Sequence, residues 1–344
     1  MPDIDVVILN WNGLHFLKQF LPLLIRHTPE EDAQIVVADN GSTDESLNWL
    51  AANYGKRVKT ISFDQNYGFA EGYNRALQQT QSNYAVLLNS DVEVTQGWLE
   101  PLLSAIHPAH IAAVMPRILS YAQKDNFEYA GAAGGFIDRW GFPFCRGRIL
   151  NRVEKDTGQY DDNCNVFWTT GACMMVKMVA FRDEGGFDAR FFAHMEEIDL
   201  CWRFQASGYS VLAIPGSTVY HVGGGTLPSG NPKKIFLNVR NSLFTLYKNL
   251  PRKNLIRILL VRMVLDGLAA YKFLFEGKPQ NFIAVLKAHL AFYRERKEYR
   301  PVREPNLKIL PPDQFSGYYP GSIVIDYYLR RKRNFSQLRS KVTK

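Results

Sequence analysis

The sequence predicts an α/β protein built on a doubly wound, mostly parallel sheet, followed by a helical C-terminal extension. Short β-rich runs alternate with helical patterns up to about residue 116, the runs are almost continuously apolar, and helical patterns dominate the last third. Near-continuous apolar runs are typical of parallel strands that are buried on both faces. Strand–helix–strand repetition implies right-handed crossovers and therefore a doubly wound sheet.

The predicted elements follow one another regularly. We expect strands at residues 4–9, 34–38, 58–63, 84–88 and 111–115, separated by helices at 14–25, 43–53, 70–79 and 96–106. Ser42-Thr43-Asp44-Glu45 has the pattern of a capping box, in which Ser42 and Glu45 would start the second helix. Residues 117–165 are rich in Gly, Asp and aromatic residues and predict a loop-rich excursion over the functional face. Regular structure at 166–177, a helix at 194–207, a strand at 210–214 and helices at 235–249, 255–275 and 282–296 complete the prediction.

Four of the predicted strands deliver Asn and Asp to the same edge of the sheet. The segments that follow them are Asn10-Trp11-Asn12-Gly13, Asp39-Asn40-Gly41-Ser42, Asp64-Gln65-Asn66-Tyr67-Gly68 and Asn89-Ser90-Asp91. Turn chemistry explains any one of these segments by itself, but ligands of doubly wound sheets bind beyond the carboxyl ends of the strands. Such an edge suits a nucleobase or ribose and a hard cation, with Asp91 as the natural oxygen ligand for Mg²⁺ or Mn²⁺.

Missing motifs exclude several enzyme classes. The first strand is not followed by the GxGxxG dinucleotide fingerprint, and the chain contains neither GxxxxGK[ST] nor GxSxG. Cys145, Cys164, Cys173 and Cys201 form no CxxC pair, so we expect reduced, buried thiols rather than a zinc ribbon or a disulfide scaffold. We expect no secretory signal and no membrane-spanning segment, and therefore a cytoplasmic protein.

Six segments match a known family in order along the chain. They are Val36–Ser42 (VVADNGS), Asn66–Asn74 (NYGFAEGYN), Leu87–Val92 (LLNSDV), Gly171–Val176 (GACMMV), Glu196–Arg203 (EEIDLCWR) and His221–Thr226 (HVGGGT). Together they resemble a family 2 inverting glycosyltransferase with the GT-A fold, close to the bacterial rhamnosyltransferase-like branch. The resemblance covers about residues 4–226. It implies a catalytic domain at 1–231, with a nucleotide-binding half at 1–116 and an acceptor and catalytic half at 117–231, before a basic helical region at 232–344.

The resemblance also implies roles for residues at the matching positions. Asp39 would read the pyrimidine base of the donor, Asn66 and the Gly68–Gly72 turn would border the nucleotide, and Asn89 would contact ribose or sugar. Asp91 would hold a Mg²⁺ or Mn²⁺ ion that bridges the donor diphosphate, with His221 as a further metal or diphosphate ligand. The other candidate substrate-binding residues are Asn12, Asn74, Gly171 and Trp168. Trp168, with Trp140 and Phe142, would form sugar-stacking faces or pack in the core.

The catalytic base is expected at the start of the helix at 194–207. Glu197 aligns with the usual base of the family, and Glu196 is the alternative if the helix is rotated or begins late. Asp199 lies about 200° around the helix from Glu197 and should point elsewhere. In an inverting transfer this carboxylate takes the proton of the acceptor hydroxyl, and a glutamate with the reference pKa of about 4.3 is ionised at neutral pH.

The predicted function is metal-dependent transfer of a sugar from a UDP- or dTDP-sugar, dTDP-rhamnose among them. The acceptor would be a hydroxyl of a glycan or of a polyprenyl-lipid-linked molecule in cell-surface polysaccharide synthesis. A nucleotidyltransferase is one alternative, but it would need an early Gly-rich loop with basic residues, which NWNGLHF lacks. A catalytically silent nucleotide-sugar-binding or scaffold protein is the other, because Asn89 and Glu197 depart from the residues usual at these positions.

Charge is distributed unevenly along the chain. Residues 1–249 contain 21 basic and 26 acidic side chains and residues 250–344 contain 20 and 7, so a net charge of −5 precedes one of +13. The helix at 255–275 gathers Arg257, Arg262, Asp266 and Lys272 on about half of the helical wheel and leaves an apolar face. That face is expected to pack on the catalytic domain beneath a solvated basic face, or to dock on the anionic inner face of the cytoplasmic membrane. Nucleic acid is not an expected partner.

Overall fold

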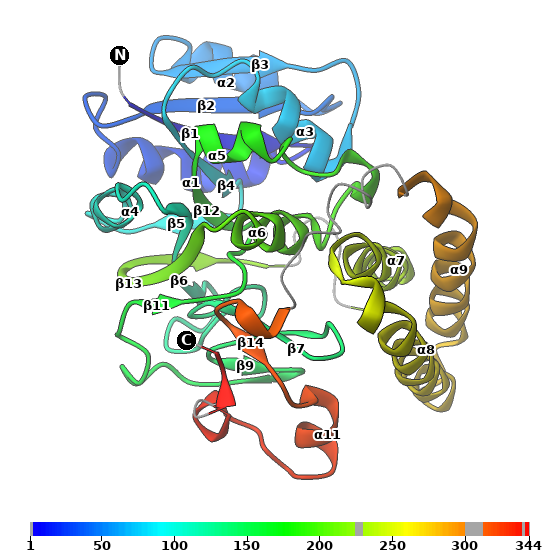
Figure 1. Ribbon diagram of the computed structural model, residues 1–344. Helices are drawn as coiled ribbons and strands as arrows, with labels where there is room; N and C mark the ends of the chain where they lie inside the picture. Colours follow the sequence, from blue (N-terminus) through cyan, green and yellow to red (C-terminus); the bar gives the residue numbers. More distant parts are fainter. Residues whose placement is uncertain (1–2, 224–229, 300–311, 339–340, 344) are drawn as a thin grey trace.

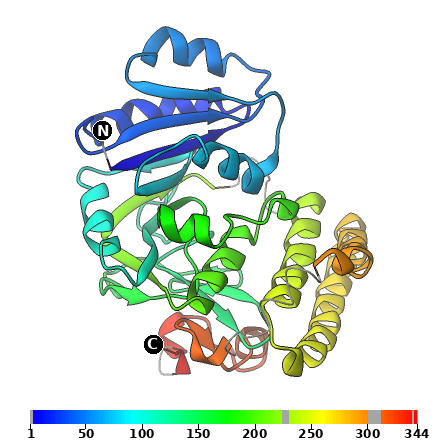
Figure 2. The ribbon, with the colours of Figure 1, turned by 45° about the horizontal axis from the view of Figure 1, so that its top comes forward.

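The computed structural model describes residues 3–223, 230–299, 312–338 and 341–343 (Figure 1). A large mixed sheet occupies the centre and a smaller sheet lies beside it, next to the C-terminal tail. Three long helices, α7 (Pro232–Asn249), α8 (Arg252–Phe275) and α9 (Pro279–Glu295), form a layer of their own along one side of the molecule (Figure 2).

Within the described residues the main sheet has nine strands in the order β11-β13-β6-β12-β4-β1-β2-β3, with β5 paired to β13. Its strands are β1 (Ile4–Asn10), β2 (Gln34–Asp39), β3 (Val58–Ser62), β4 (Tyr84–Asn89), β5 (Val92–Val94), β6 (Ile111–Ser120), β11 (Cys164–Asn165), β12 (Cys173–Lys177) and β13 (Ser210–His221). β1 is parallel to β2 and β4, and β6 is parallel to β13, whereas β12 is antiparallel to both of its neighbours. The predicted α/β class is confirmed.

Helices cover the main sheet and connect its strands. They are α1 (Leu14–Arg26), α2 (Ser46–Tyr54), α3 (Gly68–Leu77), α4 (Leu99–Ile106), α5 (Met178–Asp183) and α6 (Glu196–Ala206). β1, β2 and β4 are buried along almost their whole length, as their apolar runs predict. The four cysteines are free thiols, of which Cys164 alone is partly exposed.

The predicted capping box does not form. α2 begins at Ser46 rather than at Thr43, because the Ser42 hydroxyl accepts hydrogen bonds from the N–H of Asn12 (2.9 Å) and from Nδ2 of Asn10 (3.3 Å). The polar residues that follow β2 therefore bind the loop after β1, and Ser42 does not cap the first turn of α2.

Residues 117–165 contain more regular structure than their composition predicts. β7 (Gly135–Asp138), β8 (Pro143–Cys145), β9 (Arg148–Ile149) and β10 (Arg152–Val153) form a second sheet with β14 (Tyr318–Tyr319). β14 lies parallel to β7, and α11 (Ile323–Tyr328) then starts with the N–H of Ile323 bound to the buried carboxylate of Asp138 at 2.9 Å. The segment is rich in turns and loops, as expected, but it also contains these short strands, and the C-terminal tail supplies the edge strand that completes their sheet.

The last strand of the main sheet is longer than predicted. β13 runs on to His221 because a register shift between Ile214 and Thr218 lets it continue along β6 past Pro215. His221 is therefore the final residue of a strand rather than a loop residue that follows one. Gly224–Thr226 of the same motif lie outside the described residues.

α8 buries polar side chains and exposes apolar ones. Eight large apolar residues, 39–90% exposed and spaced one, three or four positions apart, form what we call the α8 stripe: Ile256, Leu260, Met263, Val264, Leu268, Tyr271, Leu274 and Phe275. On the opposite side Arg262 lies 3.8 Å above the ring centroid of Phe142 and donates to the carbonyl of Gly141 (3.0 Å) and to Ser242 Oγ (2.8 Å). Leu255 and Ile258 of α8 pack in the core, as expected of an apolar face. The expectation that Arg262 and Asp266 are solvated is wrong, because both charges have buried partners.

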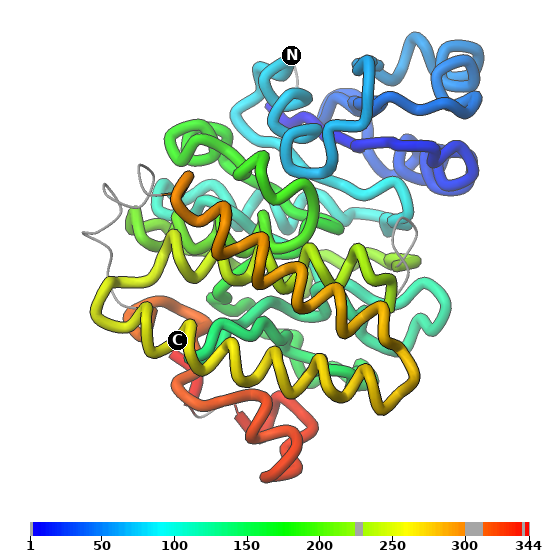
Figure 3. Tube along the Cα trace, turned by 90° about the vertical axis from the view of Figure 1, so that its right-hand side faces the viewer, coloured from blue at the N-terminus to red at the C-terminus, as the bar shows by residue number. Residues whose placement is uncertain are grey.

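α8 and α9 run side by side across the outer face of the helical layer (Figure 3). Tyr293 of α9 contacts Met263 of α8, and His289 of α9 lies 3.2 Å from the carboxylate of Asp266. None of the helices within the described ranges combines the length and apolarity that crossing a bilayer requires.

Candidate active site

A buried polar network joins the carboxyl ends of β1 and β2. Asp39, the last residue of β2, is fully buried, and its carboxylate accepts from Nδ2 of Asn10 and from the N–H of Ser42, both at 2.9 Å. Oδ1 of Asn12 accepts the N–H of Thr43 at 2.7 Å. The structure thus brings Asn12 and Asp39 together at the sheet edge and gives Asp39 two loop contacts.

The next loop along this edge is held by Asn40 and Asn66. Nδ2 of Asn40 donates to Oδ1 of Asn66 (3.1 Å) and to the carbonyl of Gly68 (3.0 Å), and Asn66 also accepts the N–H of Gly68 (2.8 Å). Gly68 has a φ of +78°, and a Cβ there would lie 2.6 Å from Phe192. The carbonyl of Phe192 accepts the N–H of Phe69 at 2.6 Å. The start of α3 therefore docks directly on the turn that precedes α6.

Asp91 and His221 meet although 130 positions separate them. β5 makes this possible, because it follows Asp91 at once and pairs with the end of β13. Nε2 of His221 lies 3.1 Å from Oδ1 of Asp91, and its Nδ1 lies 3.4 Å from Oε2 of Glu128. Burial opposes the charged forms, but His221 lowers the pKa of Asp91, and the two carboxylates raise the pKa of His221 to about 10.

The Asp91–His221 pair fits a divalent cation. Adjacent ligands of an octahedral ion with bonds of about 2.1 Å lie about 3 Å apart, which is close to the 3.1 Å between these two atoms. In the part of the chain that the structure describes, no three His, Cys, Asp or Glu side chains are grouped around a common metal position. A cation here would therefore take its remaining ligands from other oxygens, and a substrate diphosphate commonly supplies them to Mg²⁺.

Two adjacent glutamates begin α6. Glu196 is 4% exposed, Glu197 is more exposed, and Oε2 of each has no hydrogen-bond partner among the described residues. Burial raises the pKa of Glu197 to about 7, and burial together with Glu197 raises the pKa of Glu196 well above its ordinary value. The raised pKa of Glu197 lies in the range where a carboxyl exchanges protons readily near neutral pH.

The turn before α6 has an unusual backbone that α7 holds in place. Three non-glycine residues at positions 192–195 have φ between 64° and 75°, a region that costs roughly 1–3 kcal/mol per residue. Nδ2 of Asn241, a fully buried residue of α7, donates to three carbonyls of residues 191–194 at 2.8–2.9 Å. Asn241 thus positions the backbone from which Glu196 and Glu197 project.

A buried ionic network fixes the other side of α6. Asp199 is fully buried and accepts from Lys248 Nζ (2.8 Å), Arg203 Nε (3.1 Å) and Asn249 Nδ2 (2.8 Å). Burial opposes its charge, but Lys248 and Arg203 lower the pKa of Asp199 below its ordinary value. The side chain of Asp199 is directed to residues of α7, and the helical spacing predicts a direction different from that of Glu197. Lys248 and Asn249 belong to α7, so the contacts of Asp199 join residues on both sides of the domain boundary predicted at residue 231. The boundary itself stays a prediction.

Two candidate substrate-binding residues make structural contacts. Both amide atoms of Asn74 bind the backbone of Phe187, at 2.8 and 2.9 Å. Trp168 is 3% exposed, donates from Nε1 to the carbonyl of Phe136 at 2.9 Å, and covers Gly135 so closely that a Cβ there would lie 2.1 Å from the ring. For Trp168 the structure shows core packing and leaves no ring face open for a sugar.

Asn89 and Gly171 lie next to each other at the end of β4. The N–H of Asn89 donates to the carbonyl of Ala172 at 3.0 Å. A Cβ at Gly171 would lie 2.9 Å from the ring of Phe69, the second residue of α3. Both residues therefore lie at the same edge as Asp91.

Two buried charged residues of the site, Glu128 and Arg148, were not identified by any sequence motif. Glu128 contacts His221, and Arg148 places Nη2 3.1 Å from Cys145 Sγ while its Nε has no hydrogen-bond partner among the described residues. Burial raises the pKa of Cys145, Arg148 opposes this, and Glu128 and Glu197 add to it, so these three charges surround one thiol. Glu128 and Arg148 lie in residues 117–165, where no periodic pattern distinguishes an inward-facing charge.

Solved structures with this fold define the class of protein. S. aureus TarS 1–349 in complex with UDP-GlcNAc gives a TM-score of 0.54 at 15% identity, over 90% of this chain and 89% of that one. GalNAc-T7 with UDP, GalNAc and Mn²⁺ gives a TM-score of 0.58 at 18% identity, over 72% of this chain and 48% of that one. The fold is that of the GT-A glycosyltransferases, which confirms the predicted architecture.

Sequence similarity specifies the family. Residues 5–185 match Glycosyl transferase family 2, and the chain belongs to this family. An N-acetylglucosaminyl-diphospho-decaprenol L-rhamnosyltransferase of Mycobacterium tuberculosis is 26% identical over 238 residues, 64% of this chain and 76% of the relative. A pre-mycofactocin glycosyltransferase of the same organism is 27% identical over 225 residues, 64% of this chain and 42% of the relative. The predicted enzyme class and its rhamnosyltransferase-like branch are confirmed.

Proposed function

We propose that this glycosyltransferase is metal-dependent and inverting, and that it moves a sugar from a UDP- or dTDP-sugar to a hydroxyl of a glycan or lipid-linked acceptor in cell-surface polysaccharide synthesis. The observation that carries the proposal is the Asp91–His221 pair, whose imidazole also lies 3.4 Å from Glu128. The name of the mycobacterial relative supports an L-rhamnose donor such as dTDP-rhamnose and a polyprenyl-diphosphate-linked acceptor.

Glu197 is the proposed base. Its carboxylate takes the proton of the acceptor hydroxyl while the hydroxyl oxygen bonds to the anomeric carbon and the nucleotide diphosphate leaves, so the configuration inverts in one displacement. Glu197 is favoured over Glu196 because its side chain is the more exposed of the two. Burial and the neighbouring Glu197 raise the pKa of Glu196 well above its ordinary value.

Asp91 and His221 are the proposed protein ligands of Mg²⁺ or Mn²⁺. When bound, the ion would neutralise charge that builds up on the leaving diphosphate. Glu128, 3.4 Å from Nδ1 of His221, would hold the imidazole so that Nε2 faces the ion. Structural neighbours crystallised with Mn²⁺, GalNAc-T7 and the mannosyltransferase PcManGT from Pyrobaculum calidifontis (TM-score 0.51, 12% identity, 89% of this chain and 83% of that one), support a divalent cation.

Asp91→Ala is expected to abolish stabilisation by donor and metal together. The melting temperature of the wild-type protein should rise with UDP- or dTDP-sugars plus Mn²⁺, since a ligand at 100 times its Kd stabilises the folded state by about 2.7 kcal/mol. Thermal-shift titrations of both proteins measure the difference. Asp125→Ala removes an exposed carboxylate outside the site and should keep the full shift. A full Mn²⁺-dependent shift in Asp91→Ala would overturn the metal assignment.

Peripheral contact with an anionic membrane is also proposed, as a soluble enzyme must meet a lipid-linked acceptor at the bilayer surface. The α8 stripe offers a continuous apolar surface, and exposed cations flank it at Lys253, Arg257 and Lys272. Apolar insertion together with attraction of Lys and Arg to anionic headgroups is how interfacial helices bind.

Leu260→Asp is expected to weaken binding to vesicles of phosphatidylglycerol and phosphatidylcholine by at least about tenfold, because burying a leucine contributes about 1.5–3 kcal/mol. Co-sedimentation with these vesicles measures the change. Val179→Asp on α5 is the matched control, since Val179 and Leu260 are 55% and 54% exposed, and it should bind like wild type. Unchanged binding of Leu260→Asp would exclude the stripe as the contact.

A further inference from the structure

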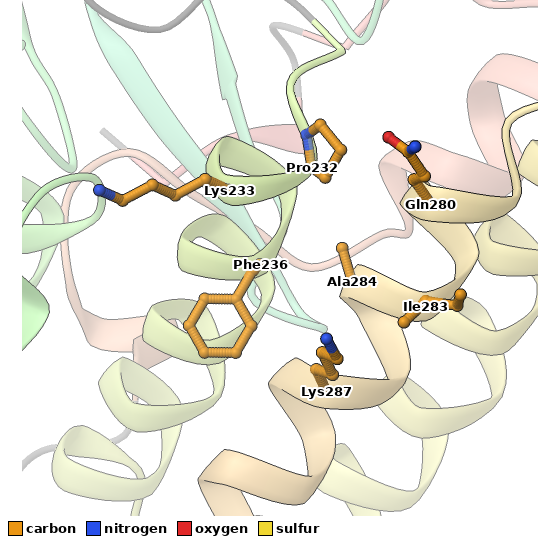
Figure 4. Close-up of a pocket in the computed structure, with 7 residues that line it drawn as sticks. All are labelled: Pro232, Lys233, Phe236, Gln280, Ile283, Ala284 and Lys287. Atoms are coloured by element: carbon orange, nitrogen blue, oxygen red, sulfur yellow. The ribbon is translucent and has the colours of Figure 1, made fainter.

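A groove of about 400 Å³ lies between the start of α7 and the start of α9 (Figure 4). Its walls are mainly apolar, with Phe236 on one helix facing Ile283 and Ala284 on the other, and its cations are Lys233 and Lys287. No acidic side chain lines it among the described residues. We propose that this groove binds the polyprenyl diphosphate portion of a lipid-linked acceptor, an inference that rests on the proposed function.

The two lysines of the groove lie in different places, and Figure 4 shows Lys287 extending between the two helices and Lys233 extending outward from the rim. Nζ of Lys233 lies 5.0 Å from the ring centroid of Phe192, in the turn that precedes the catalytic glutamates. Within the described residues neither lysine has a carboxylate at ion-pair distance, and the positive end of the α7 dipole adds to their charge. This end of the groove is therefore complementary to a diphosphate.

The same end of α7 adjoins the catalytic centre. Asn241, on the same helix, donates to the carbonyls of Phe191, Ala193 and His194 at 2.8–2.9 Å. This turn leads directly into Glu196 and Glu197, the first residues of α6. A diphosphate held at the start of α7 would accordingly direct the sugar attached to it toward the base.

The groove also adjoins the outer apolar surface of the helical layer. Ile283 lines the groove and belongs with Leu286 and Leu290 to an exposed row on α9, 46–70% exposed and spaced three and four positions apart. α9 packs against α8, where Tyr293 contacts Met263 of the α8 stripe, so both apolar rows lie on adjacent helices. A polyprenyl chain leaving the membrane would follow an apolar path to the groove. A water-soluble glycan would gain nothing from such a path, so the geometry favours the lipid-linked class of acceptor.

Farnesyl diphosphate, a short isoprenoid diphosphate, is the probe, and its affinity for the full-length protein is measured by calorimetry. Ile283→Glu and Lys287→Glu should each weaken binding about tenfold, by placing a carboxylate against the chain or the diphosphate. Ile325→Glu on α11 and Lys56→Glu near α2 are matched controls at exposed positions outside the groove and should leave the affinity unchanged. Equal affinity of all four variants would overturn the proposal that the groove binds this ligand.

Two further ligands separate the parts of the proposal. Inorganic pyrophosphate that binds as tightly as farnesyl diphosphate would overturn the apolar contribution, and farnesol that does so would overturn the diphosphate contribution. The donor thermal shift with Mn²⁺, measured in parallel, distinguishes this inference from the proposed function. A variant that keeps the thermal shift with the donor but no longer binds farnesyl diphosphate supports the proposal that the groove binds the diphosphate lipid. A wild-type protein that binds farnesyl diphosphate without any donor shift contradicts the proposed function alone.

Discussion

Glu197→Gln is expected to lower kcat by about 10²–10⁴-fold, the usual contribution of a general base. Glutamine keeps the shape of the side chain but cannot accept the proton of the acceptor hydroxyl. Donor binding should change little, because the base acts in the transition state. Initial rates of transfer and the donor thermal shift measure the two effects separately. Glu196→Gln is the matched control, and a larger loss there than in Glu197→Gln would move the base to the neighbouring residue.

The pH dependence of the same reaction checks the assignment again. The base must be ionised, and the pKa of Glu197 is raised to about 7, so kcat should rise as the pH increases through about 7 and then level off. The residual rate of Glu197→Gln should lack this rise. The free energy of unfolding should fall as the pH rises from about 4.5 to about 7. In this range the carboxyl of the folded protein keeps a proton that the unfolded chain loses near the ordinary pKa of 4.5. A rate that falls as the pH rises through 7 would contradict the role of Glu197.

Lys248→Met is expected to lower the free energy of unfolding by about 3 kcal/mol or more, as removing one partner of a buried ion pair does. Lys248 is buried and its Nζ binds the carboxylates of Asp188 (2.7 Å) and Asp199 (2.8 Å). Methionine fills the space but leaves Asp199 charged, with only Arg203 and Asn249 as partners. Urea unfolding at neutral pH measures the loss.

The control for this change is Lys253→Met, which replaces an exposed lysine of α8 and should alter stability by less than about 0.5 kcal/mol. Because Asp199 anchors the helix that carries Glu197, Lys248→Met should also lower kcat at temperatures where the variant is still folded. Equal stability of the two variants would mean that the network does not hold α6 and α7 together.

The central sheet could be predicted because its strands are buried on both faces. Runs such as those of β1 and β4 are apolar at nearly every position, a pattern that requires no knowledge of the partner strand. The second sheet could not be predicted in this way. Its strands span two to four residues, and β14 reaches it from residue 318. Pairings between such short and distant segments leave no periodic pattern in the sequence.

The candidate site was predictable where chemistry coincides with strand ends. Asp39, Asn89 and Asp91 follow the expected strands directly, so their common edge follows from topology. The direction of Trp168 was not predictable, because an aromatic residue suits both a sugar and a core. Asn241 and Lys248 were missed for another reason: they occupy helical positions where polar residues normally face water, and only the tertiary structure shows that both are buried.

α8 buries Arg262 and Asp266 and exposes large apolar residues, and this arrangement decides which of its residues can be substituted without loss of stability. Arg262 and Asp266 attach the helix through hydrogen bonds and charge, while the apolar residues opposite them contribute little to folding. Exchanges among exposed residues usually alter stability by less than about 0.5 kcal/mol. Substitutions among the outer residues of α8 are therefore expected to leave the catalytic half of the molecule undisturbed.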